Sequence, residues 1–134
     1  MKSSSDNTSK KAGHFAELLT CKYITKNKYM KIMTTNYHSR FGEIDIICYN
    51  DKYIVFVEVK ARKENALCRG VEAINFSKKK KIIKTAQIYL MNNPTNLQPR
   101  FDVSEIVIFQ DKFKPCGIRY IENAFDLEGI NEFF

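Results

Sequence analysis

The sequence predicts an α/β fold in which a mixed central sheet carries helices on its faces. Apolar residues recur at helical spacing in two segments, and five shorter segments have the composition of strands. The order along the chain is helix, three strands, helix, two strands, which is typical of helices packed on a sheet. At 134 residues, the chain has the size of one domain. We expect this domain over residues 13–123, after a disordered leader (1–12) and before a C-terminal tail (124–134).

The two predicted helices each have one apolar side. The first covers Gly13–Lys28, where apolar residues between Phe15 and Tyr23 share a face. The second takes Ser77 as its N-cap. It ends near Asn92, because Pro94 cannot continue a helix.

The predicted strands are rich in β-branched and aromatic residues. Polar residues separate them, with a turn over residues 36–42 and a charged loop over residues 63–70. Asn50 and Asp51 join the second and third strands as a hairpin. The five strands are expected over residues 29–35, 43–49, 53–62, 101–109 and 118–122.

The third strand has an unusual pattern of charge. Its successive side chains point to opposite faces of the sheet. One face carries valines, whereas the other begins apolar and ends with Glu58, Lys60 and Arg62. Glu58 and Lys60 are therefore neighbours on one face, with their Cα atoms roughly 6–7 Å apart.

The hairpin register brings Asp45 to the same face. A two-residue loop at Asn50 and Asp51 sets Asp45 opposite Phe56. Asp45 is then a diagonal neighbour of Glu58, at roughly 7–8 Å between Cα atoms. A loop of three residues would move Asp45 to the reverse face, so the prediction depends on an even loop.

Two carboxylates at this spacing suit a hard divalent cation. Mg²⁺ (or Mn²⁺) commonly takes one or two carboxylates, with waters and substrate phosphate completing its shell. We expect Asp45 and Glu58 to hold the metal. Lys60 would stabilise developing negative charge or orient and deprotonate the attacking water. The pattern therefore favours metal-assisted hydrolysis of a phosphodiester.

Structural explanations stand beside this interpretation. A Glu-x-Lys pair on a strand is often a solvated edge, and Asp45 could be a buried acid paired with Arg40 or Arg62. Asp102, between Phe101 and Val103, could pair with Arg100 or support the site from a neighbouring strand.

A formal net charge of +7 favours a polyanionic partner, most simply nucleic acid and in particular DNA. Positive charge at the start of the second helix opposes the helix dipole, so it indicates a use such as phosphate binding. The residues expected to contact nucleic acid are Arg40, Arg62, Lys63, Lys78 and Lys79.

The cysteines and the apolar segments bear on metal binding and on the compartment of the protein. No two of the four cysteines lie close together in the sequence, which argues against a zinc site. Cys21 and Cys48 have the surroundings of small core residues. No run is long enough to span a bilayer, and the first residues lack a signal peptide's apolar region. We therefore expect a cytoplasmic protein without a membrane partner, and a homodimer is left open.

Three segments, in order, resemble the YraN family of small bacterial proteins. They are residues 42–47 (GEIDII), 56–62 (FVEVKAR) and 100–103 (RFDV). The match runs from about Gly13 to Ile108. That family is similar to archaeal Holliday-junction resolvases and to the restriction-endonuclease-like PD-(D/E)xK superfamily, although this chain lacks the initial proline.

The resemblance implies a restriction-endonuclease-like core with assigned roles. Asp45 and Glu58 would be metal ligands, and Lys60 would be the catalytic lysine. The carbonyl group of Val59 would be a further ligand. The segment Gly13–Glu17 matches a Gly-x-x-x-Glu pattern on the first helix, which implies that Glu17 is another active-site acid.

The sequence thus favours a Mg²⁺-dependent endonuclease-like hydrolase that acts on DNA, with branched or single-stranded forms as candidate substrates. The alternative is a non-catalytic nucleic-acid-binding module that keeps the nuclease fold as a scaffold. A third class is an adaptor whose basic surface binds an acidic protein. Acids that face phosphate bring nothing to a simple binder, which favours the hydrolase.

Overall fold

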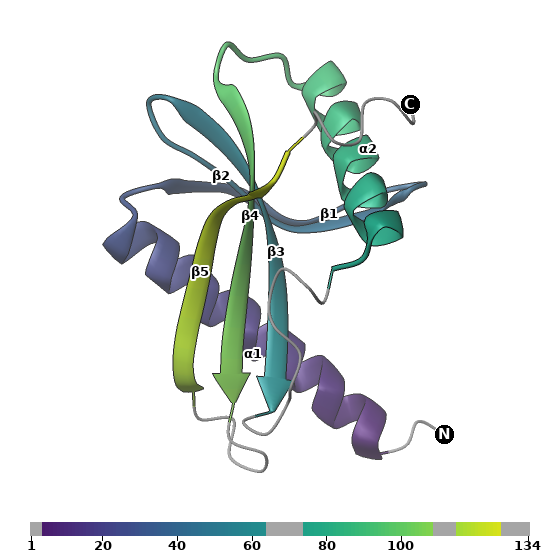
Figure 1. Ribbon diagram of the computed structural model, residues 1–134, viewed down its shortest axis with the longest axis vertical. Helices are drawn as coiled ribbons and strands as arrows, with labels where there is room; N and C mark the ends of the chain where they lie inside the picture. Colours follow the sequence, from purple (N-terminus) through teal and green to yellow (C-terminus); the bar gives the residue numbers. More distant parts are fainter. Residues whose placement is uncertain (1–3, 64–73, 109–114, 127–134) are drawn as a thin grey trace.

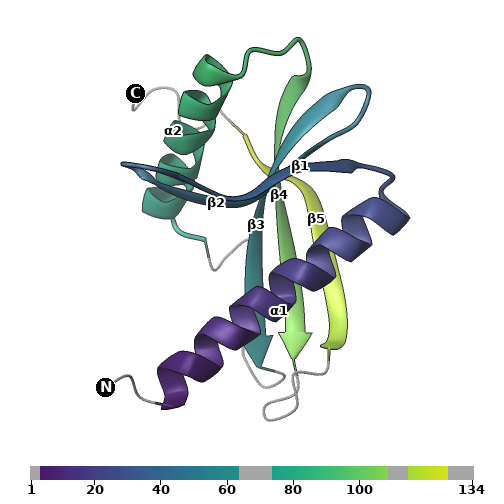
Figure 2. The same ribbon diagram turned by 180° about the vertical axis from the view of Figure 1, so that it is seen from behind.

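The computed structural model describes residues 4–63, 74–108 and 115–126, which form a five-stranded sheet with helices on both faces (Figure 1). α1 crosses one face, and α2 lies on the other, as the reverse view shows (Figure 2). The elements in chain order are α1 (Ser4–Asn27), β1 (Lys31–Ser39), β2 (Gly42–Tyr49), β3 (Tyr53–Lys63), α2 (Phe76–Asn92), β4 (Gln98–Ile108) and β5 (Pro115–Phe125).

The strands lie in the sheet in chain order, from β1 to β5. Neighbouring strands are antiparallel except β3 and β4, which are parallel. A parallel pair needs a crossover connection, and α2 lies within it. This architecture confirms the predicted α/β fold with a mixed sheet, and it is consistent with a restriction-endonuclease-like arrangement.

The sheet has an apolar core on each face. On the α2 side, Phe56 of β3 stacks on Phe101 of β4 with ring centroids 5.5 Å apart, and Tyr89 of α2 meets Phe56 edge-on. On the α1 side, Ile24 and Met30 pack against valines of β3. Each fully buried aliphatic or aromatic side chain contributes about 1.5–3 kcal/mol of burial free energy. Burial on both faces holds the middle of the sheet rigid.

Both helices begin earlier than predicted. α1 begins at Ser4 rather than Gly13, so the segment expected to be a disordered leader is helical from Ser4 onward. Once the later turns are fixed by packing, extending a helix costs little, and no proline interrupts residues 4–12. α2 takes Asn75 as its N-cap instead of Ser77, and the Asn75 side chain accepts a hydrogen bond from the Lys78 amide at 2.8 Å.

The β2–β3 hairpin has its two-residue loop one position later than predicted. Asn50 pairs with Tyr53 through a main-chain hydrogen bond of 3.0 Å, which leaves Asp51 and Lys52 as the loop. The Asn50 side chain accepts hydrogen bonds from the amides of Lys52 and Tyr53, at 2.9 and 2.7 Å. Asn50 is therefore the residue that closes the turn rather than a member of the loop. The loop still has an even number of residues, so each side chain of the hairpin points to the face of the sheet that was predicted for it.

The strands are longer than their sequence patterns indicated. β1 continues through part of the predicted turn to Ser39, because Tyr37 pairs with Ile44 and Ser39 pairs with Gly42 of β2. The turn between these strands is reduced to Arg40 and Phe41. Apart from Lys63, the loop expected over residues 63–70 lies outside the described residues. No helix in the described ranges is both long and apolar enough to traverse a bilayer.

Candidate functional site

Asp45 lies where β2 separates from β3. The paired residues of the two strands end at Ile46 and Val57. Beyond that pair, the Asp45 carboxylate takes over as acceptor, and the Val59 amide donates to its Oδ2 at 2.8 Å. This contact fixes the Asp45 side chain against β3. Its hydrogen-bond donor is therefore Val59, rather than the Arg40 or Arg62 that the sequence left open, and Arg62 pairs with Glu105 instead.

Asp45 and Glu58 form a buried acid pair. One residue beyond the last pair, Ile46 and Val57, the same register would set Asp45 opposite Glu58, instead of diagonal to it as predicted. Glu58 is only 5% exposed, and the two carboxyl groups share a hydrogen bond. Burial raises the pKa of Glu58 to about 7, and the negative charge of Asp45 adds to this shift. Burial also raises the pKa of Asp45, but the Val59 amide opposes that shift. Burial thus disfavours the ionised form of both acids.

Two lysines from different elements meet at Glu58. Lys60, two residues further along β3, places its Nζ 3.8 Å from Glu58 Oε1. Lys78, in the first turn of α2, places its Nζ 3.6 Å from the same oxygen. About a third of each lysine side chain is exposed, whereas Glu58 is almost fully covered. Both ammonium groups are thus open to an incoming molecule above a buried carboxylate.

Glu17 approaches the same cluster from α1. Its Oε2 accepts a hydrogen bond from Asn36 Nδ2 at 3.4 Å. Burial raises the pKa of Glu17, and the charge of Asp45 is the next largest cause. Asn36 has a φ of 54°, a left-handed conformation that asparagine tolerates better than most residues. The structure therefore brings Glu17 near Asp45, as the family resemblance implied and as side-chain periodicity did not.

The residues expected to bind nucleic acid fall in different surroundings. Arg40 is exposed at the β1–β2 turn, with its guanidinium 4.9 Å from the Phe41 ring centroid. Arg62 is nearly buried, and its Nε lies 3.1 Å from Glu105 Oε1. Lys79 lies over the Phe125 ring, 5.8 Å from its centroid. The side chain of Lys63 lies outside the described residues. Of the set, Lys78 is the residue that contacts the acid pair.

The donor set fits a hard cation in part. Within the described ranges, no three carboxylate, imidazole or thiolate side chains gather around one point. Asp45 and Glu58 supply two carboxylates that already approach each other, and one oxygen of Asp45 is occupied by Val59. Mg²⁺ commonly accepts one or two protein carboxylates and fills its remaining positions with water. The pair therefore offers carboxylate oxygens, the ligand type that Mg²⁺ or Mn²⁺ prefers.

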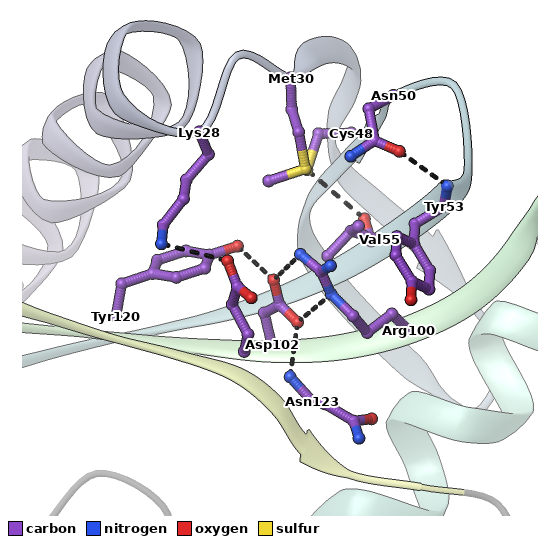
Figure 3. Close-up of polar contacts among 11 residues, drawn as sticks. Lys28, Met30, Cys48, Asn50, Tyr53, Val55, Arg100, Asp102, Tyr120 and Asn123 are labelled. Atoms are coloured by element: carbon purple, nitrogen blue, oxygen red, sulfur yellow. Dashed lines mark hydrogen bonds and ion pairs between the residues drawn. The ribbon is translucent and has the colours of Figure 1, made fainter.

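Asp102 belongs to a separate cluster on the α1 face of the sheet (Figure 3). It pairs with Val57 in the parallel register, so it faces away from Glu58. Its carboxylate accepts hydrogen bonds from Arg100 Nε and Nη2 at 2.9 Å, the Tyr120 hydroxyl at 2.6 Å and the Asn123 amide at 2.9 Å. Asp102 therefore pairs with Arg100, which settles the alternative that the sequence left open.

The cysteines are consistent with core positions. Cys48 is buried and Cys21 is partly buried, and both are free thiols. Burial raises the pKa of Cys48 to about 12, so this thiol stays protonated at neutral pH. The remaining two cysteines lie outside the described side chains.

The fold and this cluster define a class of protein: an α/β chain of restriction-endonuclease-like arrangement, with acids and lysines gathered where β2 separates from β3. A family model described as "Uncharacterised protein family UPF0102" matches residues 16–106. The chain therefore belongs to this family, which confirms the resemblance to the YraN family. The match includes every residue of the cluster around Glu58.

Curated relatives agree over almost their whole lengths. A UPF0102 protein of Alkaliphilus oremlandii (strain OhILAs) is 41% identical over 119 residues, which cover 87% of this chain and 98% of that protein. A UPF0102 protein of Clostridium tetani (strain Massachusetts / E88) is 40% identical over 119 residues, which cover 88% of this chain and 96% of that protein.

Two features of the cluster escaped the sequence patterns. The approach of Lys78 to Glu58 joins a helix to a strand, and their side chains are 20 positions apart in sequence. The contact between Asn36 and Glu17 joins β1 to α1. The one available signal was the unfavourable placement of lysines in the first turn of α2, which contains no acidic residue.

Proposed function

We propose that this protein is a Mg²⁺- or Mn²⁺-dependent endonuclease-like hydrolase of nucleic-acid phosphodiesters, with branched or single-stranded DNA as its first candidate substrates. The observation that carries the proposal is the acid pair of Asp45 and Glu58 with two lysines beside it. Two buried carboxylates that face each other destabilise the fold unless a cation or a proton lies between them, so such pairs are typical of functional sites.

Each residue has a role that its surroundings support. Asp45 and Glu58 would hold the divalent cation, which supplies charge neutralisation at phosphate and acidifies water when bound. Glu17 and the Val59 main chain lie beside this pair and would complete the polar shell. Lys60, with a third of its side chain exposed, would orient the attacking water and stabilise negative charge.

The reaction is a simple displacement at phosphorus. The water oxygen forms a bond to phosphorus, and the bond from phosphorus to one sugar oxygen breaks. The proton that the water loses ends on that leaving oxygen. The basic charge of the chain, +7 in total, favours the approach of a polyanion to this site.

A cleavage assay tests the proposal. Purified protein would be incubated with branched, single-stranded and duplex DNA, with Mg²⁺ or Mn²⁺ and with chelator. We expect metal-dependent cleavage that falls by about 10²–10⁴-fold in Lys60→Ala. Lys22→Ala serves as the matched control, because Lys22 is an exposed lysine of α1. Equal products from wild type and Lys60→Ala would refute the hydrolase.

The same preparations distinguish the non-catalytic alternative. A binding module would show salt-sensitive association with DNA that is unchanged in Asp45→Asn, and it would release no product. That combination of results would replace the hydrolase with a scaffold that only binds.

A further inference from the structure

Lys78 is a second lysine beside Glu58, and it comes from a different element. Lys60 and Glu58 share a strand, so their proximity follows from local geometry. Lys78 lies in the first turn of α2, which follows β3 along the chain after an intervening segment. Its Nζ nevertheless lies 3.6 Å from Glu58 Oε1, slightly nearer than Lys60 at 3.8 Å. The tertiary fold thus delivers a second positive charge to one buried carboxylate.

Fold stability alone does not account for this placement. A lysine in the first turn of a helix opposes the helix dipole, at a cost of about 0.3–1 kcal/mol. The first turn of α2 contains no acidic residue to offset that cost. Glu58 already has Lys60 as an ionic partner and Asp45 as a hydrogen-bond partner. Lys78 is therefore a second ionic partner for a carboxylate that already has one.

The charges around Glu58 point to an anion. When a divalent cation binds the two carboxylates, the ammonium groups of Lys60 and Lys78 stand beside a like charge. This repulsion is relieved when an anionic group lies between the lysines and the metal. A phosphodiester is such a group, and its non-bridging oxygens accept hydrogen bonds from ammonium donors. The exposed fraction of Lys78, 37%, leaves it open to such a group.

We infer that Lys78 is a catalytic residue that binds a non-bridging oxygen of the scissile phosphate, while Lys60 acts on the attacking water. This inference rests on the proposed hydrolase and divides the work between its two lysines. As the water oxygen bonds to phosphorus and the sugar oxygen leaves, negative charge grows on the phosphoryl oxygens. The Lys78 ammonium stabilises that charge without gaining or losing a proton.

Single-turnover kinetics with saturating DNA test the role. Lys78→Met keeps the aliphatic stem and removes the charge, so it preserves packing. We expect the saturating rate to fall by about 10²–10³-fold, as for other transition-state donors, with part of the rate restored in Lys78→Arg. Lys80→Met removes a lysine from the same helix and should change the saturating rate less than threefold. A Lys78→Met rate equal to wild type, with only weaker DNA binding, would overturn the inference.

A second measurement does not depend on cleavage. Inorganic phosphate would be titrated into the Mg²⁺-loaded wild-type protein while NMR follows the ε-methylene signals of its lysines. We expect saturable shifts at Lys78 and Lys60 that exceed any shift at Lys80. Shifts at Lys78 no larger than those at Lys80 would overturn the inference.

The two measurements separate the two proposals. Wild-type protein that cleaves no DNA, while Lys78 responds to phosphate, removes the hydrolase and supports a phosphate contact at Lys78. Wild-type protein that cleaves DNA as fast as Lys78→Met retains the hydrolase and removes the role of Lys78.

Discussion

Two buried acidic clusters lie on opposite faces of the same part of the sheet, and their surroundings differ. Asp102 receives four hydrogen bonds from three residues, and one of those residues is an arginine. Asp45 and Glu58 instead face each other, and Glu58 has a raised pKa as a result of burial and of that neighbour. The Asp102 carboxylate is compensated by four close hydrogen bonds, whereas Asp45 and Glu58 face each other, with the partly exposed ammonium groups of Lys78 and Lys60 at 3.6 and 3.8 Å from Glu58.

The difference separates structure from function. A carboxylate with every lone pair satisfied binds β4 to β5 and has no capacity left for a ligand. A pair of acids with a raised pKa lowers stability, and its persistence indicates another use. Glu58 and Asp102 are thus similar in burial, at 5% and 0% exposed, and opposite in electrostatic environment.

The largest effect is expected at the compensated cluster. Asp102→Ala leaves the guanidinium of Arg100, which is only 12% exposed, without its ionic partner. Removing one member of a buried ion pair costs about 3–5 kcal/mol. Urea unfolding should therefore show a midpoint far below that of wild type. A loss under 1 kcal/mol would show that the cluster is not a structural centre.

The acid pair should respond in activity rather than in stability. Asp45→Asn removes one charge from the pair, and we expect DNA cleavage to fall by about 10²–10³-fold. Its free energy of unfolding should stay within about 1 kcal/mol of the wild-type value, because the oxygen of the new side-chain amide can still accept a hydrogen bond from the Val59 main-chain amide. Activity and stability are measured on the same preparation, by DNA cleavage and by urea unfolding. Loss of stability as large as that of Asp102→Ala would erase the contrast between the clusters.

An intermediate effect is expected at Tyr120. Its hydroxyl donates to Asp102 at 2.6 Å, and burial together with the charge of Asp102 holds the pKa of Tyr120 far above its usual value. Tyr120→Phe removes this hydrogen bond to a charged group, at a cost of about 1.5–3 kcal/mol. Thermal unfolding should show a lower midpoint while DNA cleavage is retained. Lost cleavage in a folded Tyr120→Phe protein would tie the two clusters together.

The smallest effect is a pH dependence at Glu58. Its pKa rises from 4.5 to about 7 on folding, so the folded state favours the protonated acid. Its contribution to stability is complete below about pH 4.5 and is lost as the pH rises through about 7. Glu58→Gln removes this dependence. In metal-free buffer, we expect the free energy of unfolding of the variant to rise relative to that of wild type as the pH goes from 5 to 8. Parallel stability curves for the two proteins would contradict the raised pKa.

The local patterns of the sequence determined much of this protein. The β-branched run of β3 and the apolar stripes of the two helices predicted the α/β class. The alternation along β3 placed Glu58 and Lys60 on one face. A hairpin loop with an even number of residues placed Asp45 on that face. The actual loop is Asp51 and Lys52, which is also even, so Asp45 stays on the face that contains Glu58. Patterns of period two and 3.6 are local, so a single sequence contains them.

The tertiary structure decided which distant side chains meet. Lys78 approaches Glu58 because α2 connects β3 to β4, and Glu17 comes within the electrostatic influence of Asp45 because α1 packs across the opposite face. Asp102 pairs with Arg100 on its own strand, but it also binds Tyr120 and Asn123 because β5 packs beside β4, and no local pattern encodes that contact. Contacts between elements depend on how the elements pack and on where β2 leaves β3, and packing is a property of the whole fold rather than of any one segment.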